Sequence, residues 1–167
     1  MSEVVELTPY DPHWPFAYTA EAKCLTEAMA DALCALHHIG STSVPGLIAS
    51  PVIDMLGEAQ DPAAIDACAP ALADLGYVAR GENGIPGRRF FEKRDAAGNR
   101  SHHLHVFALG ATEIARHLAF RDRLRADPTL SADYAALKLA ILAGGVARRE
   151  DYQQAKAAFI TQVSRAQ

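Results

Sequence analysis

The sequence predicts an α+β fold in which a mixed β-sheet is packed with helices and the C-terminal part is helical. Strand-like apolar runs alternate with amphipathic helical segments over residues 4–109, and only helical patterns follow. The chain has 167 residues, 50% of them hydrophobic, and a chain of this length buries roughly 70% of its unfolded surface. We therefore expect one domain over residues 1–167, stable without disulfides or a structural metal.

Prolines, glycines and apolar runs define the elements of the first half. Asp61 and Pro62 have the residue types of a helix N-cap and first turn, and Gly76 has that of the residue just after a helix end. Small residues between two apolar runs indicate a loop that joins two strands. The predicted elements are a strand at 4–7, a helix at 16–35, strands at 36–39 and 51–56, a helix at 62–75 and a strand at 77–80.

The second half begins with an irregular loop, because residues 81–87 contain three glycines and a proline. A turn-like composition at 95–99 predicts that the strands on either side pair antiparallel. Thr112 and Ser131 are the predicted N-caps of two helices. The predicted elements are strands at 88–94 and 101–109 and helices at 112–126, 131–143 and 149–165.

Charge and composition argue against several kinds of partner. The net charge is −4 and the pI is about 5.9, without the basic blocks on which binding to duplex nucleic acid relies. The apolar stretch at 137–146 is too short to cross a bilayer and the start at 1–3 is acidic, unlike a signal peptide, so we expect a cytoplasmic protein. Cys24, Cys34 and Cys68 are odd in number and match no zinc spacing, which indicates reduced, mostly buried thiols.

A phosphate-binding turn is predicted where small hydroxyl residues follow the strand at 36–39. Gly40, Ser41 and Ser43 bring backbone N–H groups and hydroxyls close together, as phosphate sites require. Asp54, on the next strand, is a candidate ligand for the Mg²⁺ that would neutralise the phosphate. The same residues also fit a plain turn of small residues with an aspartate at a strand edge.

Histidines on the strand at 101–109 form a second candidate site. Alternation along a strand puts His103 and His105 on one face, roughly 7 Å apart, and His102 on the other. With Asp54 from a neighbouring strand they form a two-histidine, one-carboxylate set, which favours Zn²⁺, Mn²⁺ or Fe²⁺ over Mg²⁺. His38 is a candidate fourth member. The alternative is that the histidines hydrogen-bond substrate or neighbouring strands without a metal.

Two arginines after the loop at 81–87 are candidate anion ligands. The fork of an arginine side chain suits phosphate or carboxylate, and the glycines of the loop permit close approach to a ligand. Because Arg88 and Arg89 face opposite ways along a strand, we expect one to reach the site and the other to be a surface residue. Lys138 and Lys156, on the C-terminal helices, are further candidates for phosphate contacts.

Two other features are interpreted as structural. Trp14, next to prolines, is expected to anchor the N-terminal arm by packing. An alternation of basic and acidic residues is typical of a solvated, ion-paired helix face. This alternation involves Arg121, Asp122, Arg123, Arg125 and Asp127.

Several motifs along nearly the whole chain resemble the signature of the GrpB family. The most specific of them runs from His38 through Gly40-Ser41-Thr42-Ser43 to Leu47 and continues in Pro51-Val52-Ile53-Asp54. The others lie at 5–14, 81–91, 103–106, 120–125 and 134–138. The resemblance implies a nucleotidyltransferase-like fold. Similar domains occur fused to dephospho-CoA kinase, so the resemblance also implies a CoA-biosynthetic enzyme as a candidate partner.

The chain departs from the pattern that this resemblance implies. The superfamily pattern is a Gly-Ser after one strand, two carboxylates one residue apart on the next strand, and a third on a later strand. Gly40-Ser41 and Asp54 match, but Leu56 stands where the second carboxylate belongs, and Glu58 would lie roughly 13 Å from Asp54. His37 and Ser50 replace an expected acidic residue and an expected lysine. The missing carboxylate argues against conventional two-metal catalysis.

Three functions fit these residues. The first is a nucleotidyltransferase-like protein that depends on a nucleotide and a divalent metal (Mg, Mn or Zn) and acts on an unidentified acceptor. In it the turn at 40–43 holds the triphosphate, Asp54 with His103 and His105 forms the catalytic and metal centre, and Arg88 or Arg89 neutralises the remaining charge. The second is a noncatalytic module that binds a nucleotide or a CoA-like metabolite. The third is a metal-dependent hydrolase built on the histidine strand.

Overall fold

The fold is built on a five-stranded mixed sheet of order β1-β2-β5-β4-β3. In the computed structural model, which describes residues 4–146 and 148–165, β2 and β5 run parallel and the other neighbours antiparallel. The strands are β1 (Ala35–Ile39), β2 (Ile53–Ala59), β3 (Tyr77–Ala79), β4 (Arg89–Arg94) and β5 (Arg100–Ala108). The predicted α+β class, with its mixed sheet, is confirmed.

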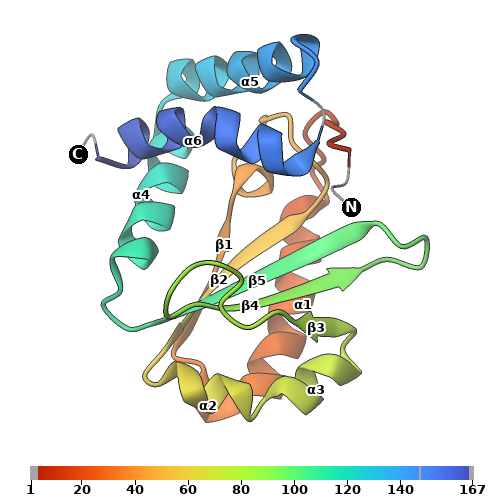
Figure 1. Cartoon of the computed structure of the whole chain (residues 1–167), viewed down its shortest axis with the longest axis vertical. Coiled ribbons are helices and arrows are strands. Elements are labelled where there is room, and N and C mark those ends of the chain that lie inside the picture. The colour runs from red at the N-terminus through yellow and green to blue at the C-terminus, as the bar shows by residue number, and fades with distance from the viewer. Residues whose placement is uncertain (1–3, 147, 166–167) are drawn as a thin grey trace.

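Helices lie on both sides of the sheet and form the C-terminal layer (Figure 1). The helices are α1 (Trp14–Met29), α2 (Pro62–Asp66), α3 (Ala69–Asp74), α4 (Thr112–Ala126), α5 (Pro128–Ala143) and α6 (Arg149–Arg165). Helices α1 to α3 pack on one face of the sheet in a core that includes Leu25, Met55 and Leu104. Helix α4 covers part of the other face through Ile114, which packs with Leu56 and Phe107. That second face, called the site face below, carries the alternate residues of the strands.

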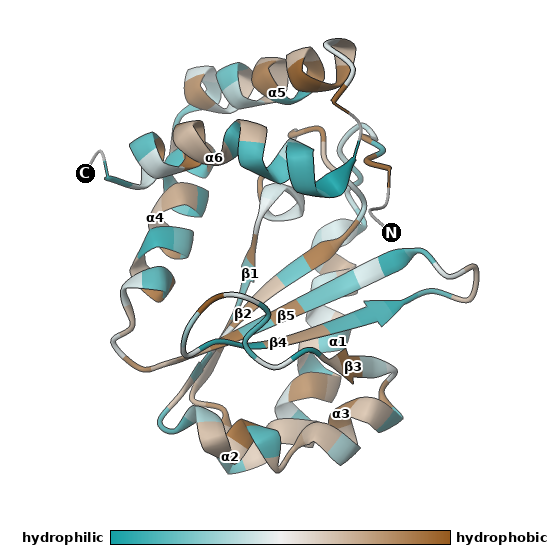
Figure 2. Cartoon of the chain, viewed as in Figure 1, coloured by the Kyte–Doolittle hydropathy of each residue, from teal (hydrophilic) through white to brown (hydrophobic). Residues whose placement is uncertain are grey.

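Hydropathy follows this arrangement. Hydrophilic residues line β4 and β5 toward the hairpin that joins them, whereas much of α5 is hydrophobic (Figure 2). A separate apolar cluster connects the C-terminal helices to the loop after β1, through Phe120, Tyr134 and Val163 against Val44 and Leu47. This cluster holds α5 and α6 next to the end of β1.

Several predicted elements have different bounds in the structure. Residues 4–7 form no strand, since Val4 makes only an isolated bridge with Arg148. The first helix ends at Met29, and the last residue of the predicted range, Ala35, already begins β1. The predicted helix at 62–75 is two helices, because Pro70 has no N–H to donate to the Asp66 carbonyl and α2 ends there.

The caps of the C-terminal helices also differ from the prediction. Helix α5 begins at Pro128 rather than Ser131, because the Asp127 carboxylate accepts from the N–H groups of Thr129 and Leu130. Helix α4 has the predicted bounds, but its N-cap is Ala111 and the Thr112 hydroxyl does not cap it. The last helix has the predicted bounds.

Other predictions have mixed outcomes. Trp14 is buried and meets Tyr10 edge-on, as expected of an anchor. The thiols are free but not mostly buried, since Cys24 and Cys34 are exposed and Cys68 is half-buried. Among the described residues no helix is long and apolar enough to span a bilayer. The acidic start at residues 1–3 lies outside the described residues, and the single-domain organisation stays a prediction.

Candidate functional site

The turn after β1 is in direct contact with Asp54. Gly40 ends β1 with φ 72°, and residues Ser41–Ser43 form one turn of 3₁₀ helix. Because Ile39 pairs with Asp54 across β1 and β2, the aspartate side chain lies beside Gly40. A Cβ at Gly40 would lie only 2.7 Å from Asp54 Oδ2, so this position accepts glycine alone. The predicted proximity of the turn and Asp54 is therefore found in the structure.

The two predicted histidines meet the other carboxylate oxygen of Asp54. His103 lies beside Asp54 in the parallel pairing of β2 and β5. The Nδ1 atom of His103 is 3.3 Å, and the Nε2 atom of His105 is 3.7 Å, from Asp54 Oδ1. Burial acts to raise the pKa of Asp54, but the imidazoles outweigh it and hold that pKa well below its usual range. Asp54 is therefore a carboxylate.

Each of these histidines meets an arginine through its second nitrogen. Arg100 Nη1 lies 3.3 Å from His103 Nε2, and Arg88 Nη1 lies 3.3 Å from His105 Nδ1. A guanidinium only donates, so both of these ring nitrogens accept. Burial lowers the pKa of His105 despite the opposing effect of Asp54, which keeps this ring neutral.

This geometry shows which atoms of Asp54, His103 and His105 could be ligands of a metal ion. Within residues 4–146 and 148–165, no three His, Cys, Asp or Glu side chains are grouped as ligands of one ion. In a ring whose other nitrogen accepts from an arginine, the nitrogen that faces Asp54 Oδ1 is the one that carries a proton rather than a free electron pair. Asp54, His103 and His105 thus come together as one polar group, in which both imidazoles face Asp54 Oδ1. Of these three side chains, only Asp54 Oδ2 is then left as a ligand for a cation. A carboxylate oxygen suits a hard ion such as Mg²⁺ or Mn²⁺.

Two lysines lie on the other side of the turn. Lys138 of α5 is 1% exposed, and its Nζ donates to Ser41 Oγ at 2.9 Å and to the Ile48 carbonyl. Burial, with a contribution from Lys156, lowers the pKa of Lys138 to about 7. Burial also lowers the pKa of Lys156 to about 8, although Asp54 opposes the shift. The two lysines, called the lysine pair below, are close enough to affect each other's charge, and Lys138 contacts Ser41.

Aromatic rings lie against this lysine pair. Lys138 lies 4.8 Å from the centre of the Tyr134 ring, and Lys156 lies 4.5 Å from that of Tyr152. The Tyr152 hydroxyl is buried and has no hydrogen-bond partner among the side and main chains described. The sequence singled out both lysines but not the rings. The signal for them was the i, i+4 spacing of Tyr134 with Lys138 and of Tyr152 with Lys156 on predicted helices.

Only one of the two predicted arginines reaches the site. Arg88 is buried, contacts His105, and donates to the carbonyls of Glu82 and Asn83 in its own loop. That loop arches across the strands in front of the sheet (Figure 1). Arg89 points to the opposite face, where it forms an ion pair with Asp66. This opposition is the expected result of strand alternation.

Two other predicted side chains have internal roles. The Ser43 hydroxyl donates to the Gly40 carbonyl and so closes the turn. His38 points away from Asp54, stacks on Tyr18 and donates to Thr42, so it is not a fourth member of the histidine group.

The basic run of α4 is not simply a solvated face. Arg121 and Arg125 donate to the carbonyls of His38 and Ser43, on either side of the Gly40 turn. The ion pair of Arg121 with Asp122 is present, as the alternation of charges suggested.

His117 was missed by the sequence analysis. Its ring lies 6.0 Å from that of His105, and burial, with a contribution from His105, lowers its pKa to about 4. A single histidine on a helix carries no signal of its own in the sequence. Its position next to the strand histidines follows only from the packing of α4.

The carboxylates other than Asp54 are committed elsewhere. Leu56, at the position of the missing second carboxylate, is fully buried. Glu58 is bound to His37 at 2.6 Å. Glu92 on β4 is held by Arg80 and Arg100. Among the candidate residues of the site face, Asp54 is thus the carboxylate that faces the turn.

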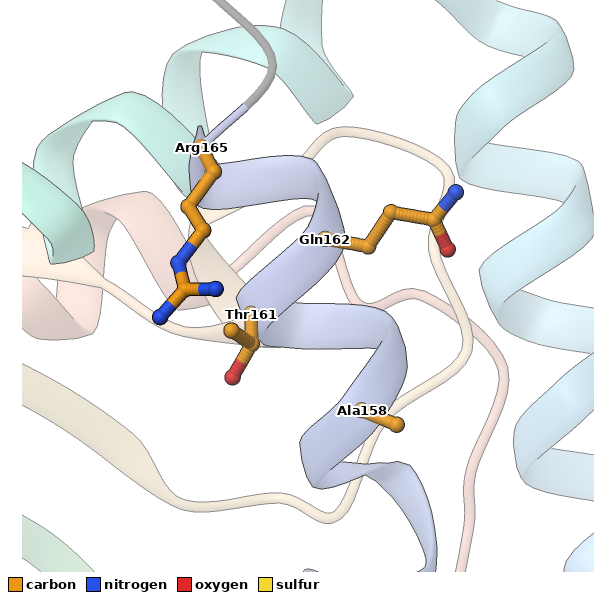
Figure 3. Close-up of a pocket in the computed structure, with 4 residues that line it drawn as sticks. All are labelled: Ala158, Thr161, Gln162 and Arg165. Atoms are coloured by element: carbon orange, nitrogen blue, oxygen red, sulfur yellow. The ribbon is translucent and has the colours of Figure 1, made fainter.

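A surface pocket elsewhere is lined by α6 alone. Its residues are Ala158, Thr161, Gln162 and Arg165 (Figure 3). None of the residues that the sequence singled out lines it, so this pocket is not part of the candidate site.

The chain resembles solved structures of a nucleotidyltransferase. A structure of Cid1 with its short product ApU has a TM-score of 0.52 at 13% identity, over 81% of this chain and 41% of that chain. A cytoplasmic RNA terminal U-transferase has a TM-score of 0.53 at 14% identity, over 81% and 41% of the two chains. At this identity the likeness shows the fold, which is nucleotidyltransferase-like as the family resemblance implied.

Closer relatives match over almost the whole chain. The UPF0157 protein YqkA of Bacillus subtilis is 38% identical over 93% of this chain, which spans 45% of that relative's length. A UPF0157 protein of Halalkalibacterium halodurans is 35% identical over 95% of this chain and 80% of its own. The crystal structure of the conserved protein GrpB from Enterococcus faecalis has a TM-score of 0.87 at 34% identity, over 95% and 94% of the two chains. Because the family model described as "GrpB protein" also matches residues 4–166, the chain belongs to the GrpB family.

Proposed function

We propose that the chain binds a nucleoside triphosphate with one divalent cation and acts as a nucleotidyltransferase-like protein on an unidentified acceptor. The supporting observation is the lysine pair beside the Gly40 turn. There the buried Lys138 contacts Ser41, and both hydrogen bonds described for its Nζ go to neutral oxygens. A buried lysine whose hydrogen bonds are to neutral oxygens is stabilised by an incoming anion.

The residues have distinct roles in this proposal. Ser41, Lys138 and Lys156 bind the phosphate oxygens, and the Gly40 turn brings them next to Asp54. Asp54 Oδ2 holds the cation, which supplies positive charge to the phosphates when bound. His103 and His105 orient the carboxylate through Oδ1. Catalysis in such a site is mainly positioning and charge neutralisation.

The structural neighbours support this ligand class. They include Cid1 with a UTP analogue, with MgGTP and, in an H336N mutant, with MgATP. The closeness of Asp54 Oδ2 to the Gly40 turn supports the choice of this oxygen as the ligand of one such cation.

A noncatalytic binding module is the second candidate. Leu56 is buried where a second carboxylate would stand, and Glu58 is bound to His37. A site with one carboxylate has fewer ligands for the two ions that clamp a phosphoryl transfer. This candidate includes CoA-like metabolites among its ligands, as well as a partner role beside a CoA-biosynthetic enzyme.

The thermal unfolding midpoint tests the ligand class. ATP, UTP, dephospho-CoA and CoA are each added with and without Mg²⁺ or Mn²⁺. A ligand at 100 times its Kd adds about 2.7 kcal/mol, which raises the midpoint of a domain this size by about 5–10 °C. We expect a cation-dependent shift with ATP or UTP that Asp54→Asn and Lys138→Met remove. Lys23→Met, at an exposed lysine of α1, is the matched control.

The remaining outcomes separate the two candidates. A shift with CoA compounds alone supports the binding module and contradicts the transferase. Nucleotide binding without release of pyrophosphate, across a panel of hydroxyl acceptors, also supports the binding module. The absence of any nucleotide shift with either cation contradicts the proposal.

A further inference from the structure

A row of polar side chains crosses three strands of the site face. Glu92 of β4 pairs with His103 of β5, which pairs with Asp54 of β2. Residues directly opposite each other in a sheet point to the same face, so the three side chains lie in one line. Arg100, from the start of β5, joins this row.

The hydrogen bonds along the row have a fixed direction. Arg100 Nη1 donates to Glu92 Oε2 at 2.6 Å and approaches His103 Nε2 at 3.3 Å. Since a guanidinium has no electron pair to offer, His103 Nε2 accepts, and a neutral ring then carries its proton on Nδ1. That Nδ1–H faces Asp54 Oδ1 at 3.3 Å.

A second arginine, Arg88, contacts one ring nitrogen of His105 in the same way. Arg88 Nη1 approaches His105 Nδ1 at 3.3 Å, while its guanidinium lies 4.9 Å from the centre of the Phe90 ring. The proton of His105 is therefore on Nε2, which lies 3.7 Å from the same Asp54 oxygen. Two different ring atoms, on two histidines, thus direct N–H groups to one oxygen.

We propose that Arg100 and Arg88 are positioning residues that fix His103 as the Nδ1–H tautomer and His105 as the Nε2–H tautomer. Both rings then direct N–H groups at Asp54 Oδ1, and Oδ2 is left to face the Gly40 turn. The inference deepens the proposed function and rests on it for the use of Oδ2. The inference implies that Asp54 binds cations that prefer oxygen ligands, because neither imidazole directs an electron pair at the carboxylate.

The tautomers can be read directly by NMR. Long-range ¹H–¹⁵N correlation spectra of histidine-labelled protein at neutral pH distinguish Nδ1–H, Nε2–H and doubly protonated rings. We expect Nδ1–H for His103 and Nε2–H for His105 in the protein without any ligand. In Arg100→Met we expect His103 to exchange between both tautomers, and in Arg88→Met we expect the same of His105.

Matched controls separate positioning from general effects. Arg80→Met removes another guanidinium from the same Glu92 carboxylate without touching a histidine. Arg89→Met removes the neighbouring arginine, which pairs with Asp66 on the opposite face. Both controls are expected to leave the two tautomers unchanged. If Arg100→Met does not fold, Arg100→Lys keeps a cation at Glu92 and is expected to loosen the tautomer of His103.

A metal titration gives a second readout. Co²⁺ is expected to give no imidazole-ligand absorption with the native protein and to give it in the double variant Arg88→Met/Arg100→Met, whose rings can turn an electron pair toward Asp54. A native spectrum with the opposite tautomer on either ring, or unchanged tautomers in the arginine variants, overturns the inference. Because these spectra need no nucleotide, a failure of nucleotide binding is distinguishable from a failure of the tautomer assignment.

Discussion

At the scale of single residues, Gly40 is the position of the site where a side chain is most tightly restricted. It combines a positive φ with an approach to Asp54 that leaves no room for a Cβ. Gly46 also has a positive φ, of 81°, but nothing lies within 4 Å of its Cβ position. Substitutions at Gly40 and Gly46 therefore distinguish the cost of backbone strain from the cost of steric contact with Asp54.

This comparison gives a first prediction. Gly46→Ala should cost about 1–2 kcal/mol of stability, as expected for a left-handed residue. Gly40→Ala should cost about 1–3 kcal/mol more, because the turn or Asp54 must move. Urea unfolding midpoints at equal slope measure the difference. Equal losses for the two variants would show that Asp54 does not press on the turn.

The lowered pKa of Lys138 gives a second prediction at this scale. Its folded-state pKa of about 7 lies below the ordinary value of 10.5, so the folded chain binds fewer protons than the unfolded chain between these values. The contribution of Lys138 to the free energy of unfolding therefore rises with pH across that window. An anion beside the lysine favours its charged form, so affinity for ATP should fall as the pH rises through 7.

Calorimetry in buffers of different ionisation enthalpy measures the proton taken up on binding. Lys138→Met should reduce that uptake and flatten the rise of stability between pH 7 and 10. Nucleotide affinity that is constant over pH 7 to 9 would contradict the role proposed for the lysine pair.

At the scale of elements, α4 braces the Gly40 turn. Arg125 Nε donates to the Ser43 carbonyl at 2.9 Å, and Arg121 Nη1 donates to that of His38 at 3.2 Å. A hydrogen bond of this kind contributes about 1 kcal/mol. Arg125→Met should therefore lower stability by about 1 kcal/mol and weaken ATP binding, while Arg116→Met, at an exposed position of the same helix, should do neither. Equal unfolding midpoints for the two variants would show that Arg125 does not stabilise the Gly40 turn.

The elements also show what the sequence can predict. Segments with their own signals, such as α4, α6 and the antiparallel pair of β4 and β5, are found where they were expected. Errors arose where one local signal outweighed another. The Pro70 ring divided a predicted helix, and the Asp127 cap started α5 earlier than Ser131.

The site was predictable to the extent that it depends on strand geometry. Strand alternation and the spacing from Gly40-Ser41 to Asp54 predicted that Asp54 lies near the turn and the histidines. The pairing of β1, β2 and β5 shows that it does. The arginine that accompanies each histidine, and the rings around the lysines, could not be predicted. Arg100 and His103, like Lys138 and Tyr134, are close in sequence, but strand and helix patterns alone do not specify that their side chains meet. The contact of Lys138 with Ser41 joins distant segments, and only the packed fold brings these two residues together.

At the scale of the whole molecule, the two faces of the sheet differ in what covers them. The face toward α1–α3 is an apolar core, and the site face is apolar where α4 packs and polar beside it. Leu56 lies under α4 with Ile39 and Phe107. The position that would hold a second carboxylate is thus part of the core, which explains the single carboxylate.

Restoring that carboxylate should disrupt the fold. Leu56→Asp buries an unpaired charge and should cost about 3–5 kcal/mol. Leu56→Met, which keeps the volume, should cost less than about 1.5 kcal/mol. Denaturant unfolding compares the two. A Leu56→Asp protein as stable as the Met variant would show that α4 does not seal this side of the sheet.

In the proposed function, Asp54 couples a divalent cation to a nucleotide held by the lysine pair. Isothermal titration of ATP, with and without Mg²⁺, into the native protein and Asp54→Asn tests it most directly. We predict that Mg²⁺ strengthens binding to the native protein and that the variant binds ATP with the same Kd whether or not Mg²⁺ is present. An equal effect of Mg²⁺ on both proteins, or no ATP binding by either, would contradict the claim.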